Sequence, residues 1–489
     1  MKTAPIIVIG AGLSGLSAAV RLSNKGYPVA VLEAGGHVGG CCSTQDADGF
    51  RFNNGAVYGA TPSLLRRAFR LLDMDLDACV AMRPIAVPQV SIMDSGTRVF
   101  TTTVEESWVE GDNAAVRTAQ YRAELHRLYQ AWRPVYRRLV DQVLPYDFSL
   151  SRTLMQLWRY LPRLSGSVSR VLEKQFSDIE VRAAVGAITL YTGLAPQKTP
   201  ATQIVGLLAL LDEGFFLPEG GMGSIPQAIC RKLESNGVDV RLNARVERIM
   251  FRHGRLQGVL LADGSVLAAS AVIATNSAVD VVKHMLDPDL VPSTLRRRQQ
   301  RAPLSHRAIS VQLGIERGQS CSVEAFAVNH VPLLDEQYRF HIPAKHAVRW
   351  FSYTNPTSVL PGLAPEGCSV VEMFVPAPLG AAAAQLSTEQ AWEVAQRYIS
   401  VLQDQLSGRI ICQRMLTPTD YAHKLNLYEG ALYGLSPAAK PTDYFPRRTG
   451  IPGLYLAGQT TYPGYGVPTA MLSGLHAANA IIKEKESAF

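Results

Sequence analysis

Three glycines near the N-terminus have a regular spacing and follow a short apolar run. Gly10, Gly12 and Gly15 form a G-x-G-x-x-G pattern, and the β-branched residues 6–9 before them suit a strand buried on both faces of a parallel sheet. In this pattern the first glycine allows a tight turn and the second lets the backbone approach a pyrophosphate. The third lets the following helix lie close to the strand. The pattern therefore predicts a dinucleotide site at the start of a helix.

A carboxylate follows at the end of the next expected strand. Residues 16–26 are expected to form a helix, and residues 29–32 a second strand that leads into Glu33. Glu33 lies eighteen positions beyond Gly15, where a carboxylate can accept hydrogen bonds from an adenosine ribose. Because this carboxylate would repel a 2′-phosphate, NADP is disfavoured, whereas NAD and FAD both remain open. We therefore predict a βαβ unit that binds the ADP part of a dinucleotide.

A second glycine cluster comes directly after this acid. Gly39 and Gly40 close a segment that is already rich in glycine, and Gly55 follows after a short alternating stretch. Because glycine has no side chain to hold the backbone away, so dense a cluster predicts a loop that passes very close to a ligand.

Another glycine-rich loop lies near the C-terminus. Residues 454–457 are expected to form a strand that ends at Gly458, and the loop as far as Gly466 leads into an expected helix at 469–479. Such a helix N-terminus directs backbone N–H groups and the positive end of its dipole at an anion or an electron-rich ring edge. The two glycine-rich ends are roughly 430 residues apart in sequence. We therefore predict one extended ligand that is held at both of its ends.

Composition narrows the class of protein. The chain has 489 residues, of which 47% are hydrophobic, and this is typical of a globular protein with a large core. The net charge is +7, but the arginines are spread among apolar residues and no nucleic-acid-binding motif occurs. We therefore expect no nucleic-acid partner and favour an anionic membrane surface. The seven cysteines are odd in number and lack C-x-x-C or zinc spacing, which predicts a reduced compartment and a cytoplasmic location.

Neither a signal peptide nor a transmembrane helix is expected, because no run of about eighteen apolar residues occurs. Two basic amphipathic stretches, 121–139 and 150–164, carry tryptophan and leucine between arginines. For 121–139 we favour a helix packed on a core with a solvated arginine face. For 150–164, core packing and a position in a membrane interface remain equally open. We therefore expect a protein that is soluble or peripherally bound to a membrane.

Further motifs resemble those of a known family. Glu33 begins an E-x-x-x-x-x-G-G pattern, Gly49 begins G-F-x-F-x-x-G, and residues 218–222 read P-E-G-G-M. With these motifs the chain resembles the flavin amine-oxidase superfamily, and most closely its phytoene desaturase/carotenoid isomerase-like branch. Members commonly carry arginine after the glycine pair, where this chain has Cys41. Many carry aspartate after the C-terminal strand, where this chain has Gln459.

The resemblance implies FAD as the cofactor, since a nicotinamide dehydrogenase would not need the second glycine pair. It implies an α/β fold in which a Rossmann-type FAD-binding domain, with a parallel sheet plus a small antiparallel sheet, is interleaved with a mixed α+β substrate domain. The FAD-binding domain is expected at 1–100, 217–290 and 405–489, and the substrate or membrane-facing domain at 101–216 and 291–404.

The residues expected to bind FAD come from both glycine-rich ends and from Val246, where the superfamily places backbone contacts to the adenine. They are Gly10, Ala11, Gly12, Leu13, Ser14, Gly15, Glu33, Ala34, Gly39, Gly40, Cys41, Gly55, Ala56, Val246, Gly458, Gln459, Gly466, Val467 and Pro468. Because flavin itself carries hydride chemistry, no side chain is assigned a catalytic role. The histidines show no ligand spacing, so no metal site is predicted.

The resemblance also implies an activity. It is that of an FAD-dependent oxidoreductase, a desaturase that forms C=C bonds in a hydrophobic polyene or isoprenoid-like substrate by hydride transfer to flavin N5. Three alternatives remain open: a cis–trans isomerase or saturase of a polyene on the same fold, a flavin amine oxidase of a small amine, and a flavin-binding scaffold without turnover. The substrate partner is thus expected to be a hydrophobic small molecule, and no feature of the sequence indicates an oligomeric state.

Overall fold

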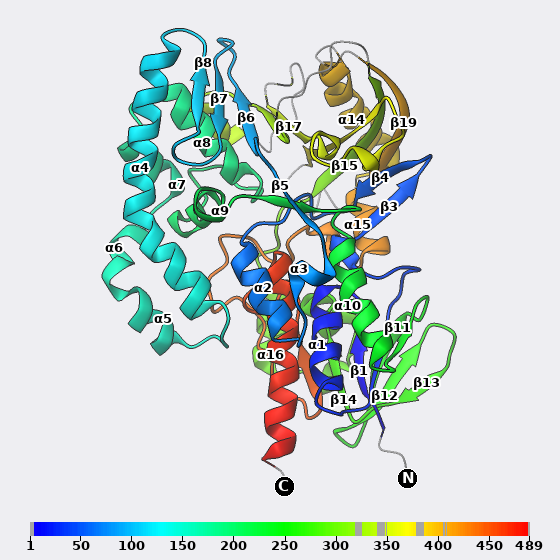
Figure 1. Ribbon diagram of the computed structural model, residues 1–489. Coiled ribbons are helices and arrows are strands. Elements are labelled where there is room, and N and C mark those ends of the chain that lie inside the picture. The colour runs from blue at the N-terminus through cyan, green and yellow to red at the C-terminus, as the bar shows by residue number, and fades with distance from the viewer. Residues whose placement is uncertain are drawn as a thin grey trace.

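A five-stranded parallel sheet lies at one end of the molecule (Figure 1). Its strands, in spatial order, are β10 (Asp239–Arg241), β2 (Val29–Leu32), β1 (Ile6–Ile9), β14 (Ala271–Ala274) and β20 (Leu454–Leu456). All four pairings are parallel, and every residue of the four strands other than β10 is buried. The predicted parallel sheet is confirmed. The computed structural model describes residues 4–487 except 318–324, 340–347, 349, 378–385, 404–405 and 407.

Three helices lie beside one another next to this sheet: α1 (Leu13–Ser23), α10 (Ser224–Ser235) and α16 (Val467–Glu486) (Figure 1). The last begins two residues before the expected start at residue 469, because Pro468 suits the first turn of a helix. Two glycines let α1 approach its neighbours. A Cβ on Gly15 would lie 1.9 Å from the carbonyl oxygen of Gly10, and a Cβ on Gly474 would lie 1.9 Å from that of Ser14. The helix is therefore in backbone contact with the turn after β1 and with α16.

A small antiparallel sheet accompanies the parallel one, as predicted. It consists of β11 (Val246–Arg252), β12 (Arg255–Leu261) and β13 (Val266–Ala268). Further short strands and helices lie along the chain outside these two sheets. They are β3 (Thr44–Ala47), β4 (Phe50–Asn53), α2 (Pro62–Arg70), α3 (Leu76–Cys79), β5 (Met82–Pro84), β9 (Phe216–Pro218), α11 (Ala278–Asp280), α12 (Ser293–Arg301) and α15 (Pro418–Lys424).

An eight-stranded sheet forms the other end of the molecule. Its spatial order is β19 (Gly408–Leu416), β15 (Ala308–Arg317), β18 (Cys368–Pro376), β17 (Phe351–Thr354), β16 (Ala327–His330), β6 (Gln89–Ile92), β7 (Arg98–Thr101) and β8 (Trp108–Glu110). Neighbouring strands are antiparallel except β16 and β6. The helix α14 (Thr388–Gln403) packs its apolar side on this sheet. The expected mixed α+β architecture is confirmed.

The sequence also predicts strands near 323–328, 338–342 and 347–353, and this prediction is only partly correct. The observed strands β16 and β17 cover 327–330 and 351–354. Residues 338–339 end a 3₁₀ helix, Leu334–Arg339, so a strand there is wrong; the rest of that stretch lies outside the described residues. The side chain of Gln337 holds this turn, because its amide donates to the carbonyl oxygens of Ala183 and Pro332.

Helices cover one side of the molecule (Figure 1). They are α4 (Ala114–Arg138), a π-helical turn (Leu139–Val143), α5 (Leu150–Leu157), a 3₁₀ turn (Trp158–Tyr160), α6 (Leu161–Leu164), α7 (Val168–Gln175), α8 (Ile179–Leu190) and α9 (Val205–Glu213). The apolar side of α4, including Leu125, Leu128 and Trp132, is buried, so its predicted core packing is confirmed. In 150–164, Leu157 is buried, and Tyr160 and Leu164 pack partly buried against the core, so core packing accounts for part of this stretch. Its other large apolar side chains are exposed: Leu150, Leu154, Met155, Trp158 and Leu161. No helix among the described residues is long and apolar enough to cross a membrane.

Replacing Gly474 by alanine is expected to destabilise the protein. The new Cβ would meet backbone rather than a movable side chain, so overpacking should lower the free energy of unfolding by about 2–3 kcal/mol. Gly206 in α9 is the matched control, because it is exposed and a Cβ there meets nothing within 4 Å. Gly206→Ala should leave stability unchanged or raise it by up to about 1 kcal/mol. Chemical denaturation of the two variants checks this; equal stabilities would contradict it.

Candidate functional site

A cavity of about 760 Å³ connects the two sheets. At one end it is lined by Ile9, Leu32 and Thr275, which end or follow strands of the parallel sheet. At the other end it is lined by Tyr353 and Phe374 of the eight-stranded sheet. The first end lies at the carboxyl edge of the strands, where ligands of open α/β sheets bind.

The residues predicted to bind FAD all line this cavity except Ala11 and Gly15. Ala11 is fully buried below the glycine turn, and Gly15 lies against Gly10, so both support the turn rather than face the cavity. The structure thus brings together side by side the two glycine-rich ends of the chain. Direct contact of each residue with FAD stays a prediction.

Glu33 has a role that the sequence pattern did not suggest. Its Oε2 accepts a hydrogen bond from the backbone N–H of Ala11 at 2.7 Å, and its Oε1 accepts one from that of Gly35 at 2.8 Å. One carboxylate therefore ties the first glycine turn to the second glycine-rich loop. A carboxylate has about four acceptor positions, so capacity remains for the ribose hydroxyls that the pattern predicts.

The two N-terminal glycine clusters are in backbone contact. The N–H of Gly39 donates to the carbonyl oxygen of Ala11 at 2.8 Å, and a Cβ on Gly40 would lie 3.6 Å from the Cα of Gly12. Gly39 and Gly40 also have φ values of +114° and +55°, which favour glycine. A Cβ on Gly39 would also lie 3.0 Å from Pro226 and 3.2 Å from Ser43, so both the backbone conformation and the lack of space favour glycine there.

This end of the cavity fits a dinucleotide. A Cβ on Gly12 would meet nothing within 4 Å, so the backbone there is open to a pyrophosphate. The N-termini of α1 and α16 both begin at residues that line the cavity, Leu13 and Val467. The helix dipoles therefore favour an anion at this place. The buried hydroxyl of Ser277, which has no hydrogen-bond partner within the described ranges, also belongs to a residue of this wall.

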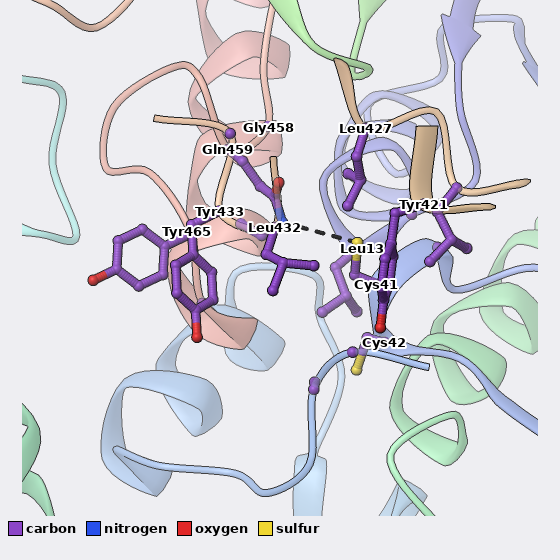
Figure 2. A pocket seen from close by; sticks show the side chains of 18 of the residues that line it. Leu13, Cys41, Cys42, Tyr421, Leu427, Leu432, Tyr433, Gly458, Gln459 and Tyr465 are labelled. Atoms are coloured by element: carbon purple, nitrogen blue, oxygen red, sulfur yellow. Dashed lines mark hydrogen bonds between the residues drawn. The ribbon is translucent and has the colours of Figure 1, made fainter. Parts of the chain in front are cut away.

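The C-terminal loop meets the second glycine loop at two of its side chains (Figure 2). The amide of Gln459 points at the thiol of Cys41, with 4.0 Å between Nε2 and Sγ. Burial raises the pKa of Cys41 to about 11, so the thiol is neutral near pH 7. The two positions at which this chain departs from the family pattern are therefore in contact, and their contact carries no charge.

Aromatic side chains dominate the far end of the cavity. The ring of Tyr58 stacks on Phe215 at 4.4 Å between centroids, and Tyr433 stacks on Tyr465 at 4.5 Å; Figure 2 shows the latter pair. Burial raises the pKa of Tyr191 to about 12, and raises those of Tyr58, Tyr433 and Tyr465 as well, so these phenols are neutral. The remaining apolar wall includes Leu64, Val140, Leu144, Ala187, Val205 and Trp350. Sequence reasoning assigned none of these residues.

One carboxyl group lies in the wall between the two ends. Glu372 of β18 is buried, and its Oε1 accepts a hydrogen bond from the backbone N–H of Asn53 at 2.5 Å. Burial raises the pKa of Glu372 to about 7, although the hydrogen bonds from Asn53 act in the opposite direction. Sequence analysis missed Glu372, since an isolated glutamate in a strand carries no pattern.

The chain also matches a known protein family. Residues 13–482 match the family described as flavin containing amine oxidoreductase. The chain belongs to this family. It is therefore a flavin-dependent oxidoreductase, and the prediction of FAD is confirmed. The predicted resemblance to the phytoene desaturase-like branch is also confirmed by the curated relatives.

Among these relatives is a zeta-carotene-forming phytoene desaturase of Myxococcus xanthus. It is 28% identical over 96% of this chain and 92% of its own length. A lycopene-forming phytoene desaturase of Pseudescherichia vulneris is 26% identical over 98% and 99%. Of the solved structures, cyclohexylamine oxidase from Brevibacterium oxydans has a TM-score of 0.62 at 18% identity, and covers 99% of both chains. Putrescine oxidase bound to putrescine has a TM-score of 0.62 at 19% identity, with 98% and 99% covered. At these identities the structures show the fold alone.

Glu372 should make stability depend on pH. Its folded pKa of about 7 lies above the ordinary value of 4.5, so the folded protein holds a proton that the unfolded chain has lost between these values. Glu372 therefore contributes roughly 3 kcal/mol to the free energy of unfolding below pH 4.5. This contribution is lost as the pH rises through 7. Glu372→Gln removes the titration.

The measurement is the free energy of unfolding of both proteins between pH 4.5 and pH 8. The charged or titratable groups near Glu372, namely Arg414 and Tyr421, are present in both, so the difference isolates Glu372. We expect the wild-type protein to lose stability relative to Glu372→Gln as pH rises. Parallel curves would contradict the elevated pKa.

Proposed function

We propose that this protein is an FAD-dependent desaturase that forms C=C bonds in a hydrophobic polyene or isoprenoid-like substrate. The observation that carries the proposal is the cavity itself, in which a glycine-lined dinucleotide end opens into an apolar, aromatic end. The full-length similarity to phytoene desaturases supports the same activity. We further infer that the cavity-lining residues of the glycine-rich loops contact FAD, and that the chain is divided into the five interleaved segments predicted from its sequence.

The aromatic end suits a substrate without a charged group. Stacked pairs such as Tyr433 with Tyr465 offer flat apolar walls, and burial of each CH₂ group of a hydrocarbon contributes about 0.8 kcal/mol. Bound FAD supplies the hydride acceptor at its N5 atom. The side chains around it orient the hydrocarbon and exclude water.

We also propose that the protein binds a membrane surface through the exposed helical segment 150–164. Leu150, Met155 and Trp158 are between 59% and 66% exposed, with Arg152 between the first two and Arg159 directly after Trp158. Tryptophan and leucine beside arginine are typical of a helix that lies in a lipid interface. Such a position would place the segment where a hydrocarbon substrate is dissolved.

The exposed segment is connected to the cavity. The segment 150–164 comes a few residues after the π-helical turn Leu139–Val143. Val140 of this turn and Leu144 directly after it line the apolar end of the cavity. An ion pair between Arg447 and Asp147 and a hydrogen bond from the hydroxyl of Tyr462 to the carbonyl oxygen of Val143 hold this connection against the C-terminal part of the chain. A substrate that leaves the membrane at this segment therefore has only a short distance to reach the aromatic walls.

The activity can be tested with purified, flavin-loaded protein under anaerobic conditions. Phytoene in lipid vesicles should bleach the absorbance of oxidised flavin, and the extracted product should lack two hydrogen atoms for each new double bond. Putrescine is the control substrate and should leave the absorbance unchanged. Bleaching by putrescine alone would favour an amine oxidase, and a product of unchanged mass that forms only with pre-reduced flavin would favour an isomerase.

Membrane binding can be tested by sedimentation with anionic vesicles. Replacing Leu150, Met155 and Trp158 together by serine should weaken binding at least about tenfold, because apolar area that enters the interface is lost. The matched control replaces Val116, Ile179 and Val266, which are between 54% and 70% exposed elsewhere on the surface, by serine. This control should bind vesicles like the wild-type protein. Equal binding of both triple variants would contradict the proposed role of 150–164.

A further inference from the structure

A pair of buried asparagines joins several distant parts of the chain. The side-chain oxygen of Asn53 accepts from the N–H of Met222 at 3.0 Å and from the hydroxyl of Thr44 at 2.9 Å. The amide of Asn54 donates to the hydroxyl of Ser43 at 2.8 Å, and its oxygen accepts from Arg414 at 3.2 Å. Both asparagines are 1% exposed. They therefore form a polar junction inside an otherwise apolar region.

The junction rests on a row of polar residues across the eight-stranded sheet. Arg414 of β19 is paired with Gln312 of β15, Gln312 with Glu372 of β18, and Glu372 with Thr354 of β17. Directly paired residues point to the same face of a sheet. Gln312, Glu372 and Thr354 are all nearly inaccessible to solvent. A continuous polar row on a buried face needs partners of its own.

The backbone of Asn53 is the partner of two members of this row. Its N–H donates to Oε1 of Glu372 at 2.5 Å, and its carbonyl oxygen accepts from Nε2 of Gln312 at 2.7 Å. These contacts join residues 319 and 259 positions apart in the sequence. Arg414 donates to Gln312 and Asn54, and in the described part of the chain no cationic group lies within ion-pair distance of Glu372. The carboxylate of Glu372 is thus directed to the backbone of Asn53.

The next residues of the chain form a wall of the cofactor end. The N–H of Ala56 donates to the carbonyl oxygen of Cys41 at 2.9 Å, and a Cβ on Gly55 would lie 2.8 Å from that oxygen. Gly55, Ala56 and Cys41 all line the cavity. With so little clearance, a shift of Asn53 or Asn54 would displace this wall.

We propose that Glu372 is a positioning residue of the cofactor site: with Gln312 it holds Asn53 in place, and so fixes the Gly55–Ala56 wall against Cys41. The eight-stranded sheet thereby determines the shape of the FAD-binding end, although it contributes no glycine loop of its own. The same strand, β18, carries Phe374, which lines the aromatic end. Retention of FAD thus depends on a strand that also faces the substrate end. The inference rests on the flavin family and holds whatever the substrate is.

The test compares the rate of FAD release from the holoprotein in two variants that differ in hydrogen-bonding ability. Glu372→Leu leaves the N–H of Asn53 without its acceptor and should release FAD about tenfold faster or more. Glu372→Gln retains an acceptor oxygen at the same position and should stay within about threefold of the wild-type rate. FAD fluorescence, which increases on release, reports both rates.

A control separates positioning from general loss of stability. Met373 is the next residue of β18, points to the opposite, apolar face and is fully buried. Met373→Ala should lower the melting temperature while it leaves the rate of FAD release nearly unchanged. If Met373→Ala and Glu372→Leu release FAD equally fast at equal loss of melting temperature, the proposal is wrong.

A second variant keeps the proposal testable if Glu372→Leu does not fold. Gln312→Leu removes the donor to the carbonyl oxygen of Asn53 and leaves Glu372 intact. It should also accelerate FAD release beyond the rate of Met373→Ala. Wild-type release rates in Gln312→Leu would overturn the proposal. Because no variant is assayed with a substrate, these results are independent of whether the protein desaturates polyenes.

Discussion

The cofactor end of this protein depends on direct contact between backbones at the carboxyl edge of the parallel sheet. The turn after β1, the helix α1 and the helix α16 approach so closely that no side chain fits between them, and the second glycine loop is hydrogen-bonded to the same turn. Gly15 and Gly474 permit the helix contacts, and Gly40 permits the loop contact. Since these contacts have no side chains to interlock, hydrogen bonds such as those of Glu33 must fix their relative positions.

Two carboxylates hold backbone segments of the cofactor end in place, in different surroundings. Glu33 is half-buried and joins two loops that are close in sequence. Glu372 is buried in the other sheet and accepts a hydrogen bond from Asn53, which is 319 positions away in sequence. A buried carboxylate is costly to desolvate, and its elevated pKa reflects this cost. The buried carboxylate of Glu372 is therefore explained by the need to keep the segment at Asn53 in one conformation.

The sequence predicted the features that are determined locally. The G-x-G-x-x-G spacing, the position of Glu33 and the strand-like run of residues 6–9 each specify a structure within a few residues. The contact of Asn53 with Glu372 could not be predicted, because the two residues are 319 positions apart in sequence. It also depends on the register of β15 and β18, which places Gln312 beside Glu372. The stacking of Tyr433 on Tyr465 likewise arises only when their loops fold together. The segment 150–164 shows the limit of periodicity, which indicates an apolar face but not whether protein or lipid covers it.

The contact between Cys41 and Gln459 shows how electrostatics at the cofactor end is arranged in this chain. At these two positions, where the resemblance leads us to expect charged residues in many members, a neutral thiol here faces a neutral amide. Complementarity to the negative charges of a pyrophosphate must then come from other sources. The N-termini of α1 and α16 and the open backbone at Gly12 supply such a source, and the basic residues Arg245 and Lys424 also line the cavity. The position of these helices is therefore both a packing requirement and part of the electrostatic basis for holding the cofactor.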